Sequence, residues 1–197
     1  MILDLCIIIL GGCVISVANA LGFGADMGRT FAIVFVGIVI EILIDGITAA
    51  VCRGLPQKCV PYHGRVFQVG LREKNFYEKL HIRKWKDSIP EIGHFTGFRK
   101  NKVADPKSEK YLERFLLEIR YGQVGHFVSC ISGFLVMLFN CLPFVAWTMT
   151  LPIALVNLFL NVLPIFVLRY NGYKLNVLLK SLRKRKAPII ESVKKAY

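Results

Sequence analysis

The sequence predicts an all-α integral membrane protein with about four transmembrane helices, plus interfacial amphipathic helices on the cytoplasmic side. Hydrophobic residues make up 54% of the 197 residues, and they lie in two long blocks, 1–52 and 126–168. The first block has Arg29 as its single basic residue, and the second has no Asp, Glu, Lys or Arg. Because one crossing of the hydrocarbon takes roughly 20 apolar residues in a helix, each block is long enough for two crossings.

The changes in polarity along the chain divide it into four segments. These are a transmembrane hairpin at 1–52 with spans at about 2–23 and 30–51, a basic cytoplasmic segment at 53–125, a second transmembrane hairpin at 126–168, and a basic amphipathic tail at 169–197. The second hairpin leaves almost no residues for a turn, since two crossings of roughly 30 Å use nearly all of it at about 1.5 Å per residue. We expect Pro143 and Pro152 to bracket that turn, and a shallow re-entrant pair is the alternative.

The basic residues predict the orientation of the chain in the cell membrane. The net charge is +13, and 25 of the 26 Lys and Arg residues lie in the middle segment and the tail. Lys and Arg gather in cytoplasmic loops, and an even number of spans separates the N-terminus, the middle segment and the tail. We therefore expect a multi-pass protein with both termini in the cytoplasm. Because the cations flank the spans, anionic membrane lipids are the expected partners and nucleic acid is not.

Two stretches of the polar segments have the spacing of amphipathic helices. After Asp105-Pro106, a typical helix start, apolar residues recur at helical intervals from Tyr111 to Ile119. Leucines recur in the same way from Leu175 to Leu182, beside a basic face. The first helix is expected to lie on the membrane and lead into the third span, and the second to lie on an anionic bilayer.

Glu41 and Asp45 are acidic residues inside the second predicted span, four residues apart and so on one helix face. An ionisable group within the membrane is costly, and it is a functional hypothesis by default. The pair would suit a small transporter. The alternative is that Asp45 lies near the cytoplasmic interface, while Glu41 pairs with a basic group at a helix end.

His126 opens the third span, where the basic segment meets the apolar block. Its unperturbed pKa of about 6.5 would let it deprotonate a hydroxyl group. Gln123, three residues earlier on the same face, could orient its ring. The alternative is an interfacial histidine that anchors the helix. Asn157 and Asn161 share a face of the fourth span, where such residues mostly hydrogen-bond neighbouring helices.

A dense basic cluster surrounds an aromatic residue at Arg83, Lys84, Trp85, Lys86 and Asp87. Lys and Arg bind phosphate groups, and tryptophan suits a membrane interface or a ring. The alternative is a loop that binds lipid headgroups and has no chemistry. The sequence contains no Walker loop, dinucleotide fingerprint, GxSxG, HExxH or HxxxxD motif, so ATP-driven and zinc chemistry are not expected.

Over about residues 76–186 the chain resembles the glycosyl-4,4'-diaponeurosporenoate acyltransferases, small bacterial membrane proteins of staphyloxanthin-type carotenoid synthesis. Three blocks carry the resemblance: Ile82–Asp87 with Pro90 and Glu91; Glu118, Arg120 and His126; and Asn161, Pro164, Arg169, Tyr170, Asn171 and Leu175. The chain departs from the family pattern at Gln123, where the family tends to have Glu, at Phe127, where it has Trp, and at 172–174, where it has Arg-Pro-Arg.

The resemblance implies transfer of a fatty acyl group from acyl-CoA or acyl carrier protein to a hydroxyl of a lipid or glycolipid acceptor, with no bound cofactor or metal. His126 would take the hydroxyl proton, and the catalytic set would include Glu118, Gln123 and Asp87. The residues expected to bind substrate are Arg83, Lys84, Trp85, Lys86, Glu91, Arg120, Asn161, Arg169, Tyr170 and Asn171. The alternative is a non-catalytic membrane protein that binds anionic lipid or scaffolds a lipid-synthesis complex.

Overall fold

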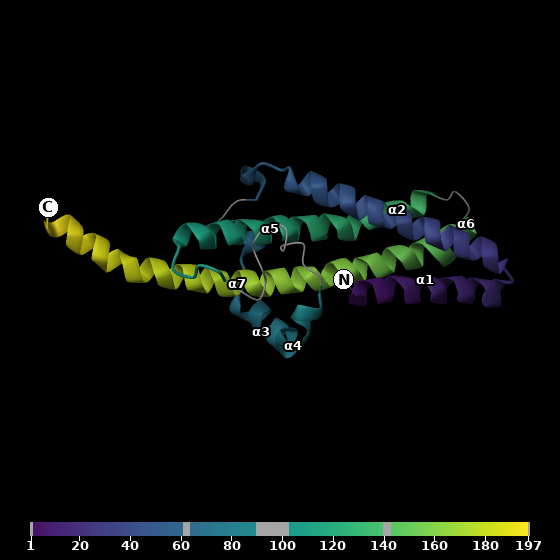
Figure 1. Cartoon of the computed structure of the whole chain (residues 1–197), viewed down its shortest axis with the longest axis horizontal. Helices are drawn as coiled ribbons and strands as arrows, with labels where there is room; N and C mark the ends of the chain where they lie inside the picture. The colour runs from purple at the N-terminus through teal and green to yellow at the C-terminus, as the bar shows by residue number, and fades with distance from the viewer. Residues whose placement is uncertain (1, 61–63, 90–102, 140–142, 197) are drawn as a thin grey trace. The chain divides into compact units, whose positions relative to one another are not determined.

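The computed structural model describes residues 2–60, 64–89, 103–139 and 143–196. Within these ranges every regular element is a helix, which confirms the predicted all-α class (Figure 1). Four described helices are long and apolar enough to cross a membrane: Leu5–Phe23, Met27–Arg53, Glu109–Leu138 and Ala146–Lys186. The chain divides into two compact units, which we describe in turn.

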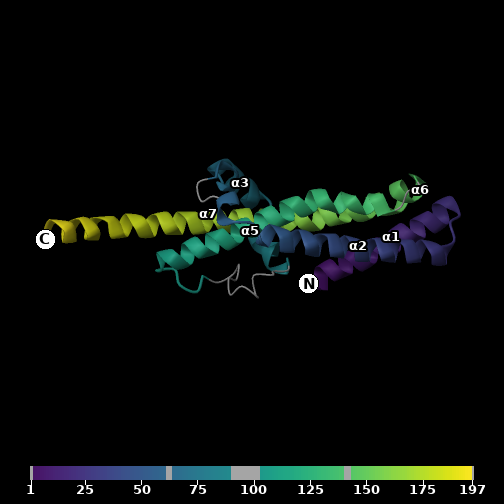
Figure 2. The same ribbon diagram turned by 90° about the horizontal axis from the view of Figure 1, so that it is seen from above.

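The first unit comprises residues 1–55, 88–90 and 124–165. Its helices are α1 (Ile2–Phe23), α2 (Met27–Arg53), the end of α5 (Glu109–Ser132), the 3₁₀ helix η5 (Gly133–Phe139), α6 (Pro143–Val145), the π turn η6 (Ala146–Thr150) and the start of α7 (Leu151–Ala196). Helices α1 and α2 form an antiparallel hairpin (Figure 2). Its link includes Gly24, with a positive φ of 64°, and Asp26, whose side chain caps α2 by accepting the Arg29 N–H at 2.7 Å.

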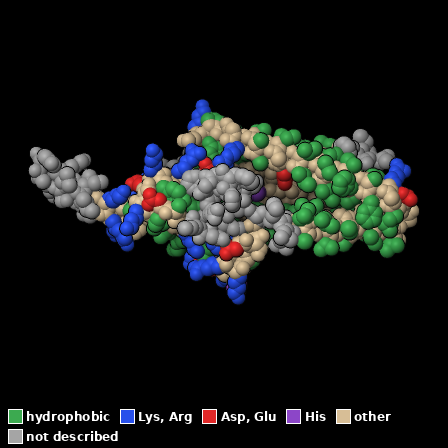
Figure 3. Space-filling model, viewed as in Figure 1, with side chains coloured by type: hydrophobic (Ala, Val, Ile, Leu, Met, Phe, Trp, Pro, Cys, Tyr) green, Lys and Arg blue, Asp and Glu red, His purple; other side chains and the backbone are tan. Residues whose placement is uncertain are grey.

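Apolar side chains form both the inside and the outside of this unit. Its core consists of Ile15, Val34, Val145, Met149 and Ile153. The Ile153 side chain packs directly on Gly37, where an added Cβ would lie 2.8 Å from Ile153 Cδ1. Small residues at such contacts are typical of helix packing in membranes. Hydrophobic side chains also cover the visible outer face of α1 and α2 (Figure 3), as expected of a surface in contact with lipid.

Pro152 does not bracket the second hairpin turn as we predicted, because it lies inside a helical run that begins at Pro143. A proline has no N–H, so the Thr148 carbonyl, four residues earlier, loses its α-helical partner. Asn19 of α1 donates its Nδ2 to this carbonyl at 2.8 Å, and the run widens into η6. A side chain from α1 therefore compensates for the proline. Residues 140–142, between η5 and α6, lie outside the described residues.

The second unit comprises residues 56–87, 91–123 and 166–197. Its elements are η1 (Gln57–Cys59), η2 (Arg65–Phe67), α3 (Leu71–Lys79), α4 (Ile82–Trp85), the 3₁₀ turn η3 (Lys86–Ser88), the first part of α5 and the second part of α7. His81, with a φ of 52°, turns the chain sharply from α3 into α4. Lys and Arg side chains are visible over α3, α4 and the later part of α7 (Figure 3).

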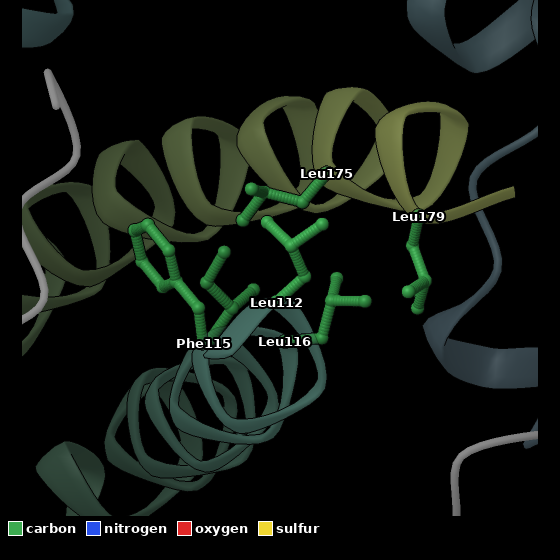
Figure 4. Packing of buried hydrophobic residues seen from close by; sticks show 6 residues of the cluster. Leu112, Phe115, Leu116, Leu175 and Leu179 are labelled. Atoms are coloured by element: carbon green, nitrogen blue, oxygen red, sulfur yellow. The ribbon is translucent and has the colours of Figure 1, made fainter. Parts of the chain in front are cut away.

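The two predicted amphipathic stripes pack against each other in this unit (Figure 4). Leu112, Phe115, Leu116 and Ile119 of α5 form one core cluster with Leu175 and Leu179 of α7. Leu112 and Leu179 are completely buried, and Arg183 of α7 pairs with Glu109 and Glu113 of α5. The expectation that each stripe rests on the bilayer is therefore corrected, because each covers the other.

Candidate functional site

A polar cluster lies inside the first unit, where α2, α5 and α7 meet. His126 of α5 shares a hydrogen bond of 2.8 Å between its Nδ1 and the Oδ1 of Asn161 in α7. Asn161 in turn donates its Nδ2 to Asp45 Oδ2 of α2 at 3.1 Å. Three residues from three helices therefore form a continuous chain of hydrogen bonds.

Asn157, one turn before Asn161 in α7, supports this chain. Its Nδ2 donates to Asp45 Oδ1 at 3.4 Å, and its Oδ1 accepts from Asn161 Nδ2 at 2.9 Å. Both asparagines are buried, and both bond a neighbouring helix, as their position in an apolar span predicted. Asp45 thus has an amide donor on each carboxylate oxygen.

Glu41 lies one turn before Asp45 in α2 and is 5% exposed. Neither of its carboxyl oxygens has a hydrogen bond of acceptable geometry with a described residue. A Cβ at Gly133 would collide with both Glu41 Oε1 and the Asn157 amide. Only glycine therefore fits at position 133 while Glu41 occupies this place. The idea that Glu41 pairs with a basic group finds no support among the described residues.

In the second unit, Glu73 of α3 is the centre of a separate cluster. Arg169 of α7 donates to it from Nε and, at 2.9 Å, from Nη2, and the Tyr77 hydroxyl donates at 2.6 Å. Burial alone raises the pKa of Glu73, but these hydrogen bonds and the charge of Arg169 outweigh it and hold that pKa below its ordinary value. Burial, followed by the hydrogen bond to Glu73 and its charge, raises the pKa of Tyr77.

Arg169 was predicted to bind substrate, but its guanidinium is engaged within the protein. Besides the two bonds to Glu73, its Nη1 donates to the Val66 carbonyl at 2.7 Å. The structure therefore gives Arg169 a role in holding α3 and the η2 region on α7. Sequence reasoning missed Glu73 and Tyr77. Their four-residue spacing puts them on one face once the segment is helical, but no helix was predicted there.

Two other predicted residues, Arg83 and Tyr170, meet in this unit. Arg83 donates its Nε to the Tyr170 hydroxyl at 2.6 Å and its Nη2 to Glu78 at 3.0 Å. Tyr170 is completely buried, and Lys174 Nζ lies 4.4 Å from its ring centroid. The Arg83 side chain remains 66% exposed, so it can still face an anionic partner.

The rest of the basic cluster is divided between exposed and engaged side chains. Lys84 is exposed, whereas the Lys86 side chain is only 16% exposed and lies 3.9 Å from Asp87. Trp85 donates its Nε1 to the Leu80 carbonyl at 2.9 Å, which fixes the indole on the helix turn. Glu91 lies outside the described residues.

The remaining predicted residues are buried in the second unit. Glu118 pairs with Arg114 at 2.8 Å, and the Arg120 guanidinium lies 6.0 Å from the Phe67 ring centroid. Gln123 is buried, with no hydrogen-bond partner for its Oε1 among the described residues, and Asn171 is also buried. The partner of His126 Nδ1 is Asn161, so the orienting role expected for Gln123 stays a prediction.

The described residues contain no group of three His, Cys, Asp or Glu side chains placed to hold a metal ion. In the first unit, the Asn161 amide holds the His126 imidazole, and this imidazole can accept and return a proton. What the second unit offers is an exposed pair of cations, Arg83 and Lys84, which can bind phosphate. These are the elements that proton transfer and the binding of a phosphate-bearing donor require.

Comparison with known proteins identifies the family. A family model described as glycosyl-4,4'-diaponeurosporenoate acyltransferase matches residues 61–181, more than half of the chain. No curated protein and no solved structure matches this chain. The matched range includes the basic cluster, His126, Asn161 and Arg169. The chain therefore belongs to the glycosyl-4,4'-diaponeurosporenoate acyltransferase family, and it is an acyltransferase of a family that acts in carotenoid biosynthesis.

Proposed function

We propose that the protein transfers a fatty acyl group from a thioester donor, either acyl-CoA or acyl carrier protein, to a hydroxyl of a lipid or glycolipid acceptor. The observation that supports this most is the 2.8 Å hydrogen bond between His126 and Asn161. It holds one ring nitrogen of a histidine inside an apolar helical unit. The other, Nε2, has no hydrogen bond to a residue that the structure describes, and we propose that it exchanges the proton. Ester formation from a hydroxyl requires a base of this kind.

In the proposed reaction, His126 takes up one proton and returns it during a single acyl transfer. The acceptor hydroxyl oxygen attacks the thioester carbonyl carbon while His126 Nε2 takes the hydroxyl proton. When the carbon–sulfur bond breaks, the imidazolium returns that proton to the leaving sulfur. The products are an ester and a thiol, and His126 ends in its starting form. A positioned general base of this kind contributes typically 10²–10⁴-fold to the rate.

The basic cluster is proposed to bind the phosphates of the acyl carrier. Coenzyme A and the prosthetic arm of acyl carrier protein both carry phosphate, and Arg and Lys bind it by charge-assisted hydrogen bonds. Arg83 and Lys84 are the exposed cations of the cluster. Lys86, which is more buried and lies near Asp87, is expected to contribute less than these two.

The orientation predicted from the basic residues favours a donor from the cytoplasm. With cytoplasmic termini, α1 leads outward and α2 returns, so the C-terminal end of α2 at Arg53 faces the cytoplasm. Asp45 lies eight residues before that end, or roughly 12 Å along the helix axis at 1.5 Å per residue. The hydrogen-bonded cluster would then lie within reach of the cytoplasmic interface, where the thioester arrives.

Lipid mass spectrometry tests this proposal. Vesicles containing the purified protein, a glycolipid acceptor and either acyl-CoA or acyl carrier protein loaded with the same chain should yield an acceptor heavier by one acyl group. Matched vesicles without the protein should not. If neither donor gives an acylated lipid, while the protein still binds anionic vesicles, the proposed transfer is wrong and the chain acts as a lipid-binding scaffold.

A further inference from the structure

The hydrogen bonds around Asn161 determine which atoms donate and which accept in the series of hydrogen bonds that links Asp45, Asn161 and His126. We call this series the relay. The Asn161 group that faces Asp45 is its NH₂, whose Nδ2 donates to the Asp45 Oδ2 at 3.1 Å. The amide oxygen of Asn161 then points the other way, toward His126 Nδ1 at 2.8 Å. An oxygen can only accept, so His126 Nδ1 must carry the hydrogen.

The other ring nitrogen follows from this assignment. In a neutral imidazole only one nitrogen carries a hydrogen, so Nε2 has the free electron pair and is the basic nitrogen. Asn157 strengthens the arrangement, because it donates to the second oxygen of Asp45 and accepts from Asn161. Both ends of the Asp45 carboxylate are thereby held toward α7.

We propose that Asp45 is a positioning residue of the acyltransferase, which sets the tautomer of His126 through Asn161. This inference rests on the proposed role of His126 as the base. Asp45 belongs to α2, and α2 lies before the matched residues 61–181. The N-terminal hairpin is therefore more than an anchor, because it supplies the carboxylate that makes Nε2 the basic nitrogen.

The single substitutions should both impair the enzyme. In Asp45→Asn an amide group replaces one carboxylate oxygen, so a donor faces either Asn161 or Asn157 and the Asn161 amide is no longer fixed. In Asn161→Asp two carboxylates face each other. We expect kcat to fall about 10²-fold or more in each, with the KM values for donor and acceptor within about twofold of the original.

The double variant Asp45→Asn/Asn161→Asp separates positioning from mere packing. It restores the order of the groups between positions 45, 161 and 126, since the carboxylate at 161 accepts both from His126 Nδ1 and from the amide at 45. Full recovery is not expected, because the Asn157 Oδ1 and backbone carbonyl lose the donor that Asn161 Nδ2 supplies. We expect kcat to recover to within about tenfold of the original protein. If the relay does not exist, the two losses should multiply, as for independent sites, and that result overturns the proposal. Thr48→Val is the control, because Thr48 of α2 bonds Ser132 at 3.0 Å and takes no part in the relay.

A second measurement does not depend on acyl transfer. The ¹⁵N chemical shifts of the His126 ring, assigned by comparison with His126→Asn, report which nitrogen carries the hydrogen. The original protein and the double variant should show hydrogen on Nδ1, and Asp45→Asn should show a shift toward hydrogen on Nε2. An unchanged tautomer in Asp45→Asn overturns the relay even if His126 is the base. Conversely, activity that survives loss of His126 removes the proposed base but leaves the tautomer result intact.

Discussion

Arg169 of α7 forms a two-pronged ion pair with Glu73 of α3, in which Nε and Nη2 each donate to a different carboxylate oxygen. Such bidentate pairs fix geometry as well as charge. Tyr77 is the only buried residue in the nine-residue helix α3, and it packs on Phe166 of α7 with ring centroids 5.5 Å apart. The attachment of α3 to α7 within the second unit therefore depends strongly on this ion pair.

Replacing Glu73 with Gln should loosen α3. The change removes the charge and one of the oxygens that accept from Arg169, and hydrogen bonds to charged groups contribute about 1.5–3 kcal/mol. Hydrogen exchange of the α3 amides, measured by mass spectrometry in detergent or nanodiscs, should show reduced protection in Glu73→Gln. Glu78→Gln is the matched control, because Glu78 lies on the same helix but pairs with Lys74 and Arg83 at the surface, where ion pairs contribute little.

The loss of α3 amide protection in Glu73→Gln should become smaller as the pH falls. The pKa of Glu73 is held below its ordinary value in the folded protein. Its contribution is therefore fully present above the unfolded pKa of about 4.3 and is lost as the pH falls through the folded pKa. The difference in protection between the original protein and Glu73→Gln should be largest near pH 6 and shrink below about pH 4. A difference that grows on acidification would contradict the role given to this ion pair.

Gly133→Ala should destabilise the first unit. The added methyl group would collide with the Glu41 carboxyl and the Asn157 amide, and overpacking of a tight interior costs typically about 1–3 kcal/mol. Gly125→Ala, in α5, is the control, since a Cβ there meets no atom within 4 Å and alanine is the better helix former. The thermal unfolding midpoint in detergent should fall for Gly133→Ala and stay level or rise for Gly125→Ala. Equal midpoints would show that Glu41 does not occupy this place.

Lys84→Ala should weaken binding of the acyl donor. If Lys84 binds carrier phosphate, the apparent KM for the donor should rise several-fold, and added salt should reduce the difference from the original protein, because salt screens exposed charges. Lys79→Ala is the control, an exposed lysine of α3 outside the basic cluster. A donor KM that stays constant while vesicle binding falls would assign Lys84 to lipid headgroups instead.

Cysteine labelling tests the predicted topology. Single cysteines at Lys79 and Lys184, both exposed in the second unit, should be protected from a membrane-impermeant reagent in intact cells. A cysteine at Asp26, in the link between α1 and α2, should react from outside. Labelling of position 79 or 184 from outside would contradict the cytoplasmic placement of the basic segments.

The long elements of this fold were predictable because they depend on local properties of the chain. Hydropathy placed the first span at 2–23, where α1 lies, and helical spacing revealed both amphipathic stripes. What each stripe contacts was not predictable, since Leu112 and Leu179 would pack equally well on lipid or on each other. Pro152 misled the prediction of the turn because its compensation, the side chain of Asn19, comes from a helix more than 120 residues away.

In the candidate site, too, the individual residues were predictable and their contacts were not. His126 and Asp45 were recognisable from their chemistry, as ionisable groups in an apolar setting. Their connection through Asn161 was not, because it depends on the rotation of three helices about their own axes, which hydropathy does not determine. Arg169 matched a family motif, but its ion pair with Glu73 could be learned only from the folded chain.

His126 is the proposed base of acyl transfer, and the kcat of His126→Gln tests this role most directly. Glutamine keeps a hydrogen-bonding group of similar size near Asn161 but cannot take up the hydroxyl proton. We expect kcat in vesicles to fall 10²–10⁴-fold, with the protein still inserted and its thermal midpoint close to the original. Acyl transfer that survives within about threefold, less free energy than one pKa unit represents, would contradict this role.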